Sequence, residues 1–251
     1  EGCSSLDQIS IPSSVTSIED FAFSCCSSLL QIEIPSSVEL IGANCFEKCS
    51  KLTNLIIDPY QTHVQNNSFD SCISLNHITF SSLITTTNQY DFTQIGQITE
   101  ITIPPTVKSI GKNTFLGCST LTKVTIPKSV LLIGSHSFEG CSSLIQIDIP
   151  SSVSSIGSHA FKGCSSLTHI SIPLLLASIH SNLFEDCTSL SDIFISPTLK
   201  SIKSFAFKNC VKLNQIKIPA SVESIDSGAF LECFSLKQII NCSSLTEIPE
   251  R

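Results

Sequence analysis

Residues 141–163 read CSSLIQIDIPSSVSSIGSHAFKG, and Cys164 begins the next copy of the same motif. With Cys141 as repeat position 1, one copy is 23 residues long, because 164 minus 141 is 23. Stepping by 23 residues from Cys3, position 1 is cysteine each time but once, at Cys3, Cys26, Cys49, Cys72, Cys118, Cys141, Cys164, Cys187, Cys210 and Cys233, with Ile95 as the exception. Position 21 is always phenylalanine, at Phe23, Phe46, Phe69, Phe92, Phe115, Phe138, Phe161, Phe184, Phe207 and Phe230. A fixed period of this length predicts a solenoid, in which each coil buries its apolar side against its neighbours.

Each copy contains two segments that face inward. Positions 7 and 9 are apolar, as in Val124 and Ile126, and their alternation predicts a half-buried strand that proline ends at position 10. Positions 13 and 16 add a second inward side, and Gly134 at position 17 is expected to permit a tight turn. Residues 135–140 are too few for a stable α-helix, so we expect a helical turn that carries Phe138 into the core.

The pattern C-S-S-L-x-x-I-x-I-P-x-S-V-x-S-I-G-x-x-A-F-x-G resembles the treponemal-type leucine-rich repeat of the BspA-like surface proteins, over essentially the whole chain. The resemblance implies a β-rich (α/β) solenoid of about ten 23-residue coils, wound as a right-handed superhelix with a parallel sheet on its concave face. It also implies a microbial source, display on the cell surface, and adhesion to host or extracellular-matrix proteins.

We expect residues 1–251 to form a single solenoid with two irregular regions. The stretch 58–97 departs most from the consensus, but it keeps the repeat length. The end, 241–251, is abnormal because Asn241 occupies an apolar position and the motif then restarts early. The chain opens at Glu1 with the last two positions of a repeat, which suggests a piece of a longer protein.

Composition argues against two classes of partner. The net charge is −7, from 14 Lys and Arg against 21 Asp and Glu, and no basic run offers a site for nucleic acid. No apolar stretch approaches the roughly 18 residues that a membrane-spanning helix needs. We therefore expect neither nucleic-acid binding nor a membrane span in these residues.

The 13 cysteines are expected to be free thiols rather than disulfides. Stacked parallel strands keep equivalent Cβ atoms about 4.8 Å apart, wider than the roughly 3.8 Å that a disulfide prefers. Free cysteine is also a common core residue. No CxxC pair or zinc-type Cys/His spacing occurs, so we predict no metal site and no cofactor.

The residues at positions 6 and 8, here called the strip, point outward from the first strand of each coil and are the candidate partner-binding surface. The proposed binding residues are Glu33, Glu100, Lys123, Asp148, His169, Asp192, Phe194 and Lys217. Phe194 stands out because exposed aromatic side chains are enriched at binding hot spots. The alternative is that these positions vary freely because they have no packing role.

No catalytic set is apparent in the sequence. His136 and His159 share position 19 on consecutive coils, but with no carboxylate expected to orient their rings they are interpreted as exposed turn residues. Serines are abundant, but the sequence has neither a G-x-S-x-G elbow nor a phosphate-binding loop. We therefore interpret the serines as turn and surface residues. We predict no enzyme activity. Asn66 and Asn241 begin N-x-S sequons and are possible glycosylation sites.

The sequence therefore predicts a non-enzymatic scaffold that binds a protein or a glycan. The resemblance favours an adhesin-like protein at the cell surface or secreted. An intracellular leucine-rich repeat interaction module in the cytoplasm is the alternative, because a ladder of reduced cysteines suits that compartment equally well.

Overall fold

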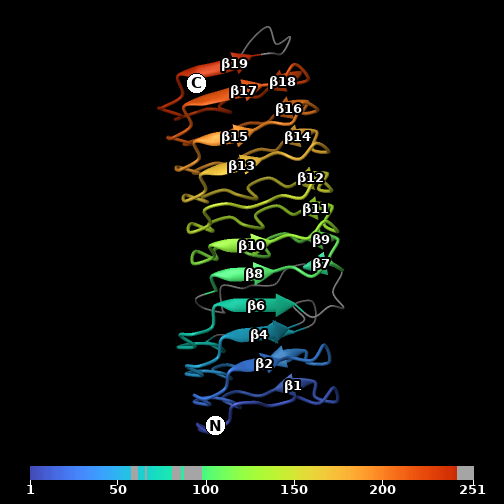
Figure 1. Cartoon of the computed structure of the whole chain (residues 1–251), viewed down its shortest axis with the longest axis vertical. Helices are drawn as coiled ribbons and strands as arrows, with labels where there is room; N and C mark the ends of the chain where they lie inside the picture. The colour runs from blue at the N-terminus through green and yellow to red at the C-terminus, as the bar shows by residue number, and fades with distance from the viewer. Residues whose placement is uncertain (58–61, 66, 81–85, 88–97, 242–251) are drawn as a thin grey trace.

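The computed structural model describes residues 1–57, 62–65, 67–80, 86–87 and 98–241. These residues form a parallel β-solenoid of about nine turns, stacked into the column seen in Figure 1. The predicted solenoid is confirmed, whereas the number of about ten coils is not. No α-helix occurs in the described part of the chain, so the α/β character is not confirmed either.

Where a coil has a first strand, that strand covers positions 6–8 or 6–9. These strands are β2 (Gln31–Glu33), β4 (Asn54–Ile57), β6 (His77–Phe80), β8 (Glu100–Thr102), β10 (Lys123–Thr125), β13 (His169–Ser171), β15 (Asp192–Phe194), β17 (Gln215–Ile218) and β19 (Gln238–Asn241). They pair in parallel as β2-β4-β6-β8-β10, β13-β15 and β17-β19. Between β10 and β13, the coil 141–163 contributes only the bridge between Gln146 and His169.

The second strand covers positions 15 and 16. These short strands are β1 (Ser17–Ile18), β3 (Leu40–Ile41), β5 (His63–Val64), β7 (Thr86–Thr87), β9 (Ser109–Ile110), β11 (Leu132–Ile133), β12 (Ser155–Ile156), β14 (Ser178–Ile179), β16 (Ser201–Ile202) and β18 (Ser224–Ile225). They pair as β1-β3-β5, β7-β9-β11-β12 and β14-β16-β18. Residues one repeat apart are partners, as Ser201 and Ser224 show, so the sequence period sets the register.

The sheet of first strands continues past the irregular stretch 58–97. β6 pairs with β4 on one side and with β8 on the other, and β7 pairs with β9. The stack therefore keeps its register where the consensus is poorest, because the repeat length is unchanged.

The phenylalanines of position 21 form a column in the core. The fully buried rings are Phe46, Phe115, Phe138, Phe161, Phe184 and Phe207. Consecutive rings are stacked, with centroids 5.1 Å apart for Phe115 and Phe138 and 5.4 Å apart for Phe138 and Phe161. Aromatic burial of this kind supplies a large part of the apolar driving force for stacking the coils.

The cysteines of position 1 form a second column. A thiol hydrogen bond to a backbone carbonyl oxygen recurs in it, at Cys49, Cys72, Cys141, Cys164, Cys187, Cys210 and Cys233. Cys164 Sγ lies 3.2 Å from the Phe138 carbonyl oxygen, and Cys187 Sγ lies 3.1 Å from that of Phe161. No disulfide joins any of the cysteines in the described residues, which confirms the predicted thiol ladder there. Burial raises the pKa of the Cys164 thiol to about 12, so it stays protonated and able to donate.

The turn that precedes each cysteine is not helical. His136 at position 19 and Gly140 at position 23 have φ values of 58° and 75°, in the left-handed region. Such residues cannot continue a right-handed helix. Instead, the Cys141 N–H donates to the Phe138 carbonyl oxygen at 3.2 Å, as in a tight turn. The expected helical turn is therefore replaced by successive turns that still bury Phe138.

The glycine of position 17 has a different role from the one expected. Gly134 does not have a positive φ, and a Cβ there would lie 2.6 Å from the carbonyl carbon of Gly111 on the preceding coil. Glycine at this position allows two coils to approach closely, and the left-handed turn falls at position 23 instead. A tight turn does follow Gly134, over residues 135–140, but the close approach of the neighbouring backbone requires the glycine there, which the sequence does not show.

Several serine hydroxyl groups form hydrogen bonds between coils and are not only surface residues. At position 12, Ser129 and Ser152 donate to the carbonyl oxygens of Val107 and Val130, each at 2.7 Å. These bonds satisfy backbone acceptors that the short strands leave free. The interpretation of the serines as surface residues was therefore incomplete.

Candidate protein-interaction surface

Strand alternation places the strip on the outside of the sheet of first strands. In β15, Ile193 is 8% exposed and packs inward, whereas Phe194 beside it is 58% exposed. The same pattern of exposed, buried and exposed residues holds in β2, β8, β10 and β13. The eight candidate residues of the strip are all exposed, so each is accessible to a partner.

The strip contains one ion pair between candidate residues. Glu100 and Lys123 are register partners in β8 and β10, and Lys123 Nζ lies 3.8 Å from Glu100 Oε2. Both side chains are at least half exposed, and exposed pairs of this kind contribute only about 0–1 kcal/mol to stability. The pair therefore leaves the charges of both residues available at the surface.

A second group gathers on β13 and β15. His169 is the register partner of Asp192, and Ser171 is the register partner of Phe194. This arrangement places an imidazole, a carboxylate and an exposed aromatic ring on two adjacent strands. Further along the strip, Lys217 of β17 pairs with Ile240 of β19, which is 38% exposed.

The remaining candidate residues lie apart from these groups. Glu33 lies in β2 near the N-terminal end, opposite Ile56 of β4. Asp148 belongs to coil 141–163, in which the segment equivalent to the first strand has only the bridge at Gln146. The strip is consequently several separate groups along the column rather than one cluster.

One of the two sequon asparagines lies outside the described residues, and the other is the last residue that the structure describes. Asn66 lies outside the described residues. The backbone of Asn241 ends β19, where it is the register partner of Ile218.

The histidine pair shows contacts that the sequence did not predict. The rings of His136 and His159 are stacked, with centroids 4.6 Å apart and 11° between their planes. The Glu139 carboxylate, three residues along the same turn, contacts Nδ1 of His136. The prediction that no carboxylate orients the rings was therefore wrong, and the left-handed backbone at His136 is what brings the two side chains together.

This pair is poorly suited to chelate a metal. Nitrogen lone pairs lie in the ring plane, so those of two parallel stacked rings do not converge on one ion. No group of three or more His, Cys, Asp or Glu side chains that could hold a metal is found among the described residues. Burial, and then the neighbouring His136 ring, lowers the pKa of His159, whose buried Nδ1 has no hydrogen-bond partner.

A buried carboxylate links three coils on the same edge. The carboxylate oxygens of Glu185 lie 2.8 Å from Lys162 Nζ, 3.3 Å from Lys208 Nζ and 2.9 Å from Asn182 Nδ2, and they accept hydrogen bonds from these groups. Burial alone would raise the pKa of Glu185, but these donors outweigh it, so the pKa lies below its ordinary value. Glu139, Lys162, Glu185 and Lys208 all occupy position 22, and this alternation of charge could have been found in the sequence.

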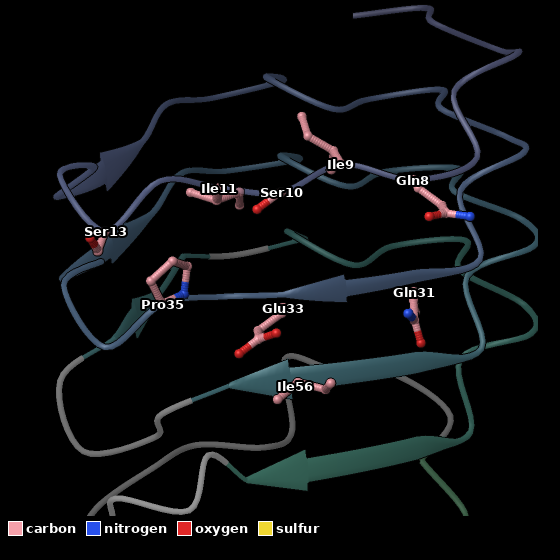
Figure 2. Close-up of a pocket in the computed structure, with 9 residues that line it drawn as sticks. All are labelled: Gln8, Ile9, Ser10, Ile11, Ser13, Gln31, Glu33, Pro35 and Ile56. Atoms are coloured by element: carbon pink, nitrogen blue, oxygen red, sulfur yellow. The ribbon is translucent and has the colours of Figure 1, made fainter.

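A groove of about 480 Å³ opens on the strip side of the first three coils. Figure 2 shows Gln8 and Ser10 of the first coil on one side of it, and Gln31 and Glu33 of β2 on the other. Of the groove residues, sequence reasoning had singled out only Glu33 as a binding residue.

The repeat motif, the parallel strands and the inward columns of Phe and Cys together point to one family. The sequence matches the BspA type leucine rich repeat region in six copies, over residues 1–98, 85–185 and 132–251. This chain belongs to that family. Leucine-rich repeat families are generally non-enzymatic scaffolds that mediate protein interactions.

Solved structures of leucine-rich repeat proteins are similar to this BspA-type chain. The Treponema pallidum leucine rich repeat protein is 24% identical, with a TM-score of 0.42 over 88% of this chain and 72% of that one. A leucine-rich repeat protein from Eubacterium ventriosum is 22% identical, with a TM-score of 0.45 over 93% of this chain and 82% of that one.

A leucine rich cell surface protein from Faecalibacterium prausnitzii is 21% identical, with a TM-score of 0.39 over 92% of this chain and 84% of that one. None of the curated proteins matches this BspA-type chain. The family assignment rests on the repeat match. Among the described residues, no helix has the length and apolar character needed to cross a membrane.

Proposed function

We propose that residues 1–251 form one solenoid that acts as a non-enzymatic protein-binding scaffold. In this proposal the protein is displayed on, or secreted from, a microbial cell and contacts host or extracellular-matrix proteins. The strip is the binding surface, and the group on β13 and β15 is its anchor.

The exposed ring of Phe194 carries this proposal. Its neighbour Ile193 supplies the inward packing of β15, so the 58% exposed ring is not required by the core. Its register partner Ser171 is small, and Asp192 and His169 provide polar groups beside it. An aromatic anchor surrounded by polar groups is typical of a binding hot spot.

Binding to a panel of immobilised extracellular-matrix proteins tests the proposal. We expect Phe194→Ala to weaken binding at least about tenfold, which corresponds to about 1.4 kcal/mol. Phe234→Ala is the matched control, because Phe234 is 82% exposed but lies at position 2, away from the strip. Equal losses in both variants, or no binding by the unmodified protein to any member of the panel, would contradict the proposal.

The free thiols support a second candidate, an intracellular interaction module. No disulfide joins the described cysteines and Cys3 is exposed, as is common in a reducing compartment. An antibody against the repeat region, applied to intact and permeabilised source cells, separates the two. Staining of intact cells supports surface display, whereas staining only after permeabilisation supports the intracellular module.

Asn66 and Asn241 remain proposed acceptors of N-linked glycan for the surface-displayed form. Mass spectrometry of peptides from the protein isolated from its source checks this proposal. Unmodified peptides at both sites would exclude it.

A further inference from the structure

We propose that the groove beside the first coil binds an extended peptide segment that carries a lysine or arginine side chain. This inference rests on the proposed function, protein binding at the strip, and deepens it by naming one site and the chemistry of its partner.

The groove arises because the first coil separates from β2 over a short segment only. On one side of the gap, the Leu30 N–H donates to the Asp7 carbonyl oxygen at 3.3 Å. On the other side, the Glu39 N–H donates to the Thr16 carbonyl oxygen at 2.8 Å, and β1 pairs with β3. Between these two hydrogen-bonded contacts, no backbone hydrogen bond joins residues 8–11 to β2, and the structure describes all of these residues.

The backbone of β2 consequently has free groups on its side nearer the first coil. The Ile34 N–H donates to the Ile56 carbonyl oxygen at 2.8 Å, toward the third coil. Since backbone groups of successive strand residues point to opposite sides, those of Gln31 and Glu33 point toward the first coil. An unpaired strand edge is a template for an extended peptide.

The side chains around the groove suit such a peptide. Gln8, Ser10 and Gln31 supply amide and hydroxyl groups that both donate and accept hydrogen bonds (Figure 2). Pro35 and Ile56 supply apolar contacts, and neither is fully exposed. The volume of about 480 Å³ lies within the range of about 300–1,000 Å³ that is usual for ligand sites.

Charge defines the side chain that the peptide carries. Glu33 is the one charged residue among those that line the groove, and it forms no ion pair with any described residue. An exposed carboxylate beside free backbone groups favours a cationic side chain. The net charge of −7 further attracts basic partners.

Titration of the ¹⁵N-labelled protein with two synthetic peptides, followed by NMR, tests the inference. The probes are acetyl-Thr-Lys-Thr-Val-amide and its matched acidic counterpart, acetyl-Thr-Glu-Thr-Val-amide. We expect the lysine peptide to shift the amide signals of Gln31 and Glu33, and the glutamate peptide to bind at least about tenfold more weakly. Glu33→Gln should weaken binding of the lysine peptide by a similar factor.

Glu39→Gln is the matched control, since Glu39 is an exposed carboxylate of the same coil at position 14, outside both the strip and the groove. It should leave the affinity for the lysine peptide unchanged. The inference is overturned by equal binding of both peptides, by equal losses in the Glu33 and Glu39 variants, or by shifts confined to β13 and β15. Shifts at Gln31 and Glu33 with the neutral disaccharide cellobiose, but with neither peptide, would overturn it in favour of a glycan.

These outcomes separate the inference from the proposed function. If Phe194→Ala abolishes matrix-protein binding while the lysine peptide causes no shift at Glu33, the inference fails and the proposed function stands. If the lysine peptide binds at Glu33 while no matrix protein binds the strip, the groove is a peptide-binding site and the proposed adhesive function is wrong.

Discussion

The Cys141 thiol donates a hydrogen bond to the Phe115 carbonyl oxygen, with 3.2 Å between Sγ and the oxygen. The acceptor lies 26 residues earlier, which is three residues more than one repeat, so the bond joins two neighbouring turns of the solenoid through the core. Cys210 and Phe184 show the same relationship at 3.2 Å. Cysteine at position 1 therefore combines a small apolar side chain with a hydrogen-bond donor, which alanine in the same place could not supply.

Replacing a ladder cysteine should cost stability through this lost bond. Cys164→Ala leaves the buried Phe138 carbonyl oxygen without its thiol donor and creates a small cavity, so we expect a cost of about 1–3 kcal/mol. Cys3→Ala, at an exposed cysteine, should change the free energy of unfolding by no more than about 0.5 kcal/mol. Urea denaturation of both variants measures the difference, and equal costs would contradict the role of the bond.

Burial should also make the ladder thiols unreactive in the folded protein. Burial raises the pKa of Cys45 and of Cys164 to about 12, so almost no thiolate is present at about pH 8. Brief iodoacetamide treatment at that pH should alkylate Cys3 and leave Cys45 and Cys164 unmodified until urea is added. Mass spectrometry locates the label, and rapid modification of Cys164 without urea would refute this expectation.

Truncation of a stacked phenylalanine should destabilise the solenoid strongly. Phe138 is fully buried between Phe115 and Phe161, so Phe138→Ala is expected to cost about 3–5 kcal/mol. Lys123→Ala changes an exposed residue of the strip and should stay within about 0.5 kcal/mol. Chemical denaturation compares the two, and a similar effect at both positions would contradict the assignment of inward and outward positions.

The histidine pair should make stability fall in mild acid. The pKa of His159 in the folded protein lies below its unfolded value of about 6.5, because burial and then the His136 ring disfavour the charged form. The folded state therefore binds fewer protons, and its stability decreases as the pH falls through about 6.5. His159→Asn should reduce this loss, since Asn182 adopts the same left-handed backbone at position 19.

Urea midpoints at about pH 7.5 and about pH 5.5 measure this effect. His169→Asn, on the exposed strip, is the matched control and should retain the decrease seen in the unmodified protein. If His159→Asn retains the full decrease as well, His159 is not its source.

Much of the core could be predicted from the sequence, because every coil has the same length. A constant period places equivalent residues in register, so the inward directions of Cys164 and Phe161 follow from the repeat. The free state of the ladder thiols followed from the spacing of parallel strands. The exposure of Phe194 followed from strand alternation beside the buried Ile193.

Only the tertiary structure decided how the turns run and which surface groups meet. Left-handed residues such as His136 turn the chain where a helical turn was expected, and they bring Glu139 onto the imidazole. The gap between residues 8–11 and β2, which leaves the free edge beside Glu33, has no counterpart in the repeat pattern. The repeated motif specifies which side chains each coil buries. How closely two coils approach, which turn residues adopt a left-handed backbone and where two coils separate depend on how neighbouring coils pack against each other.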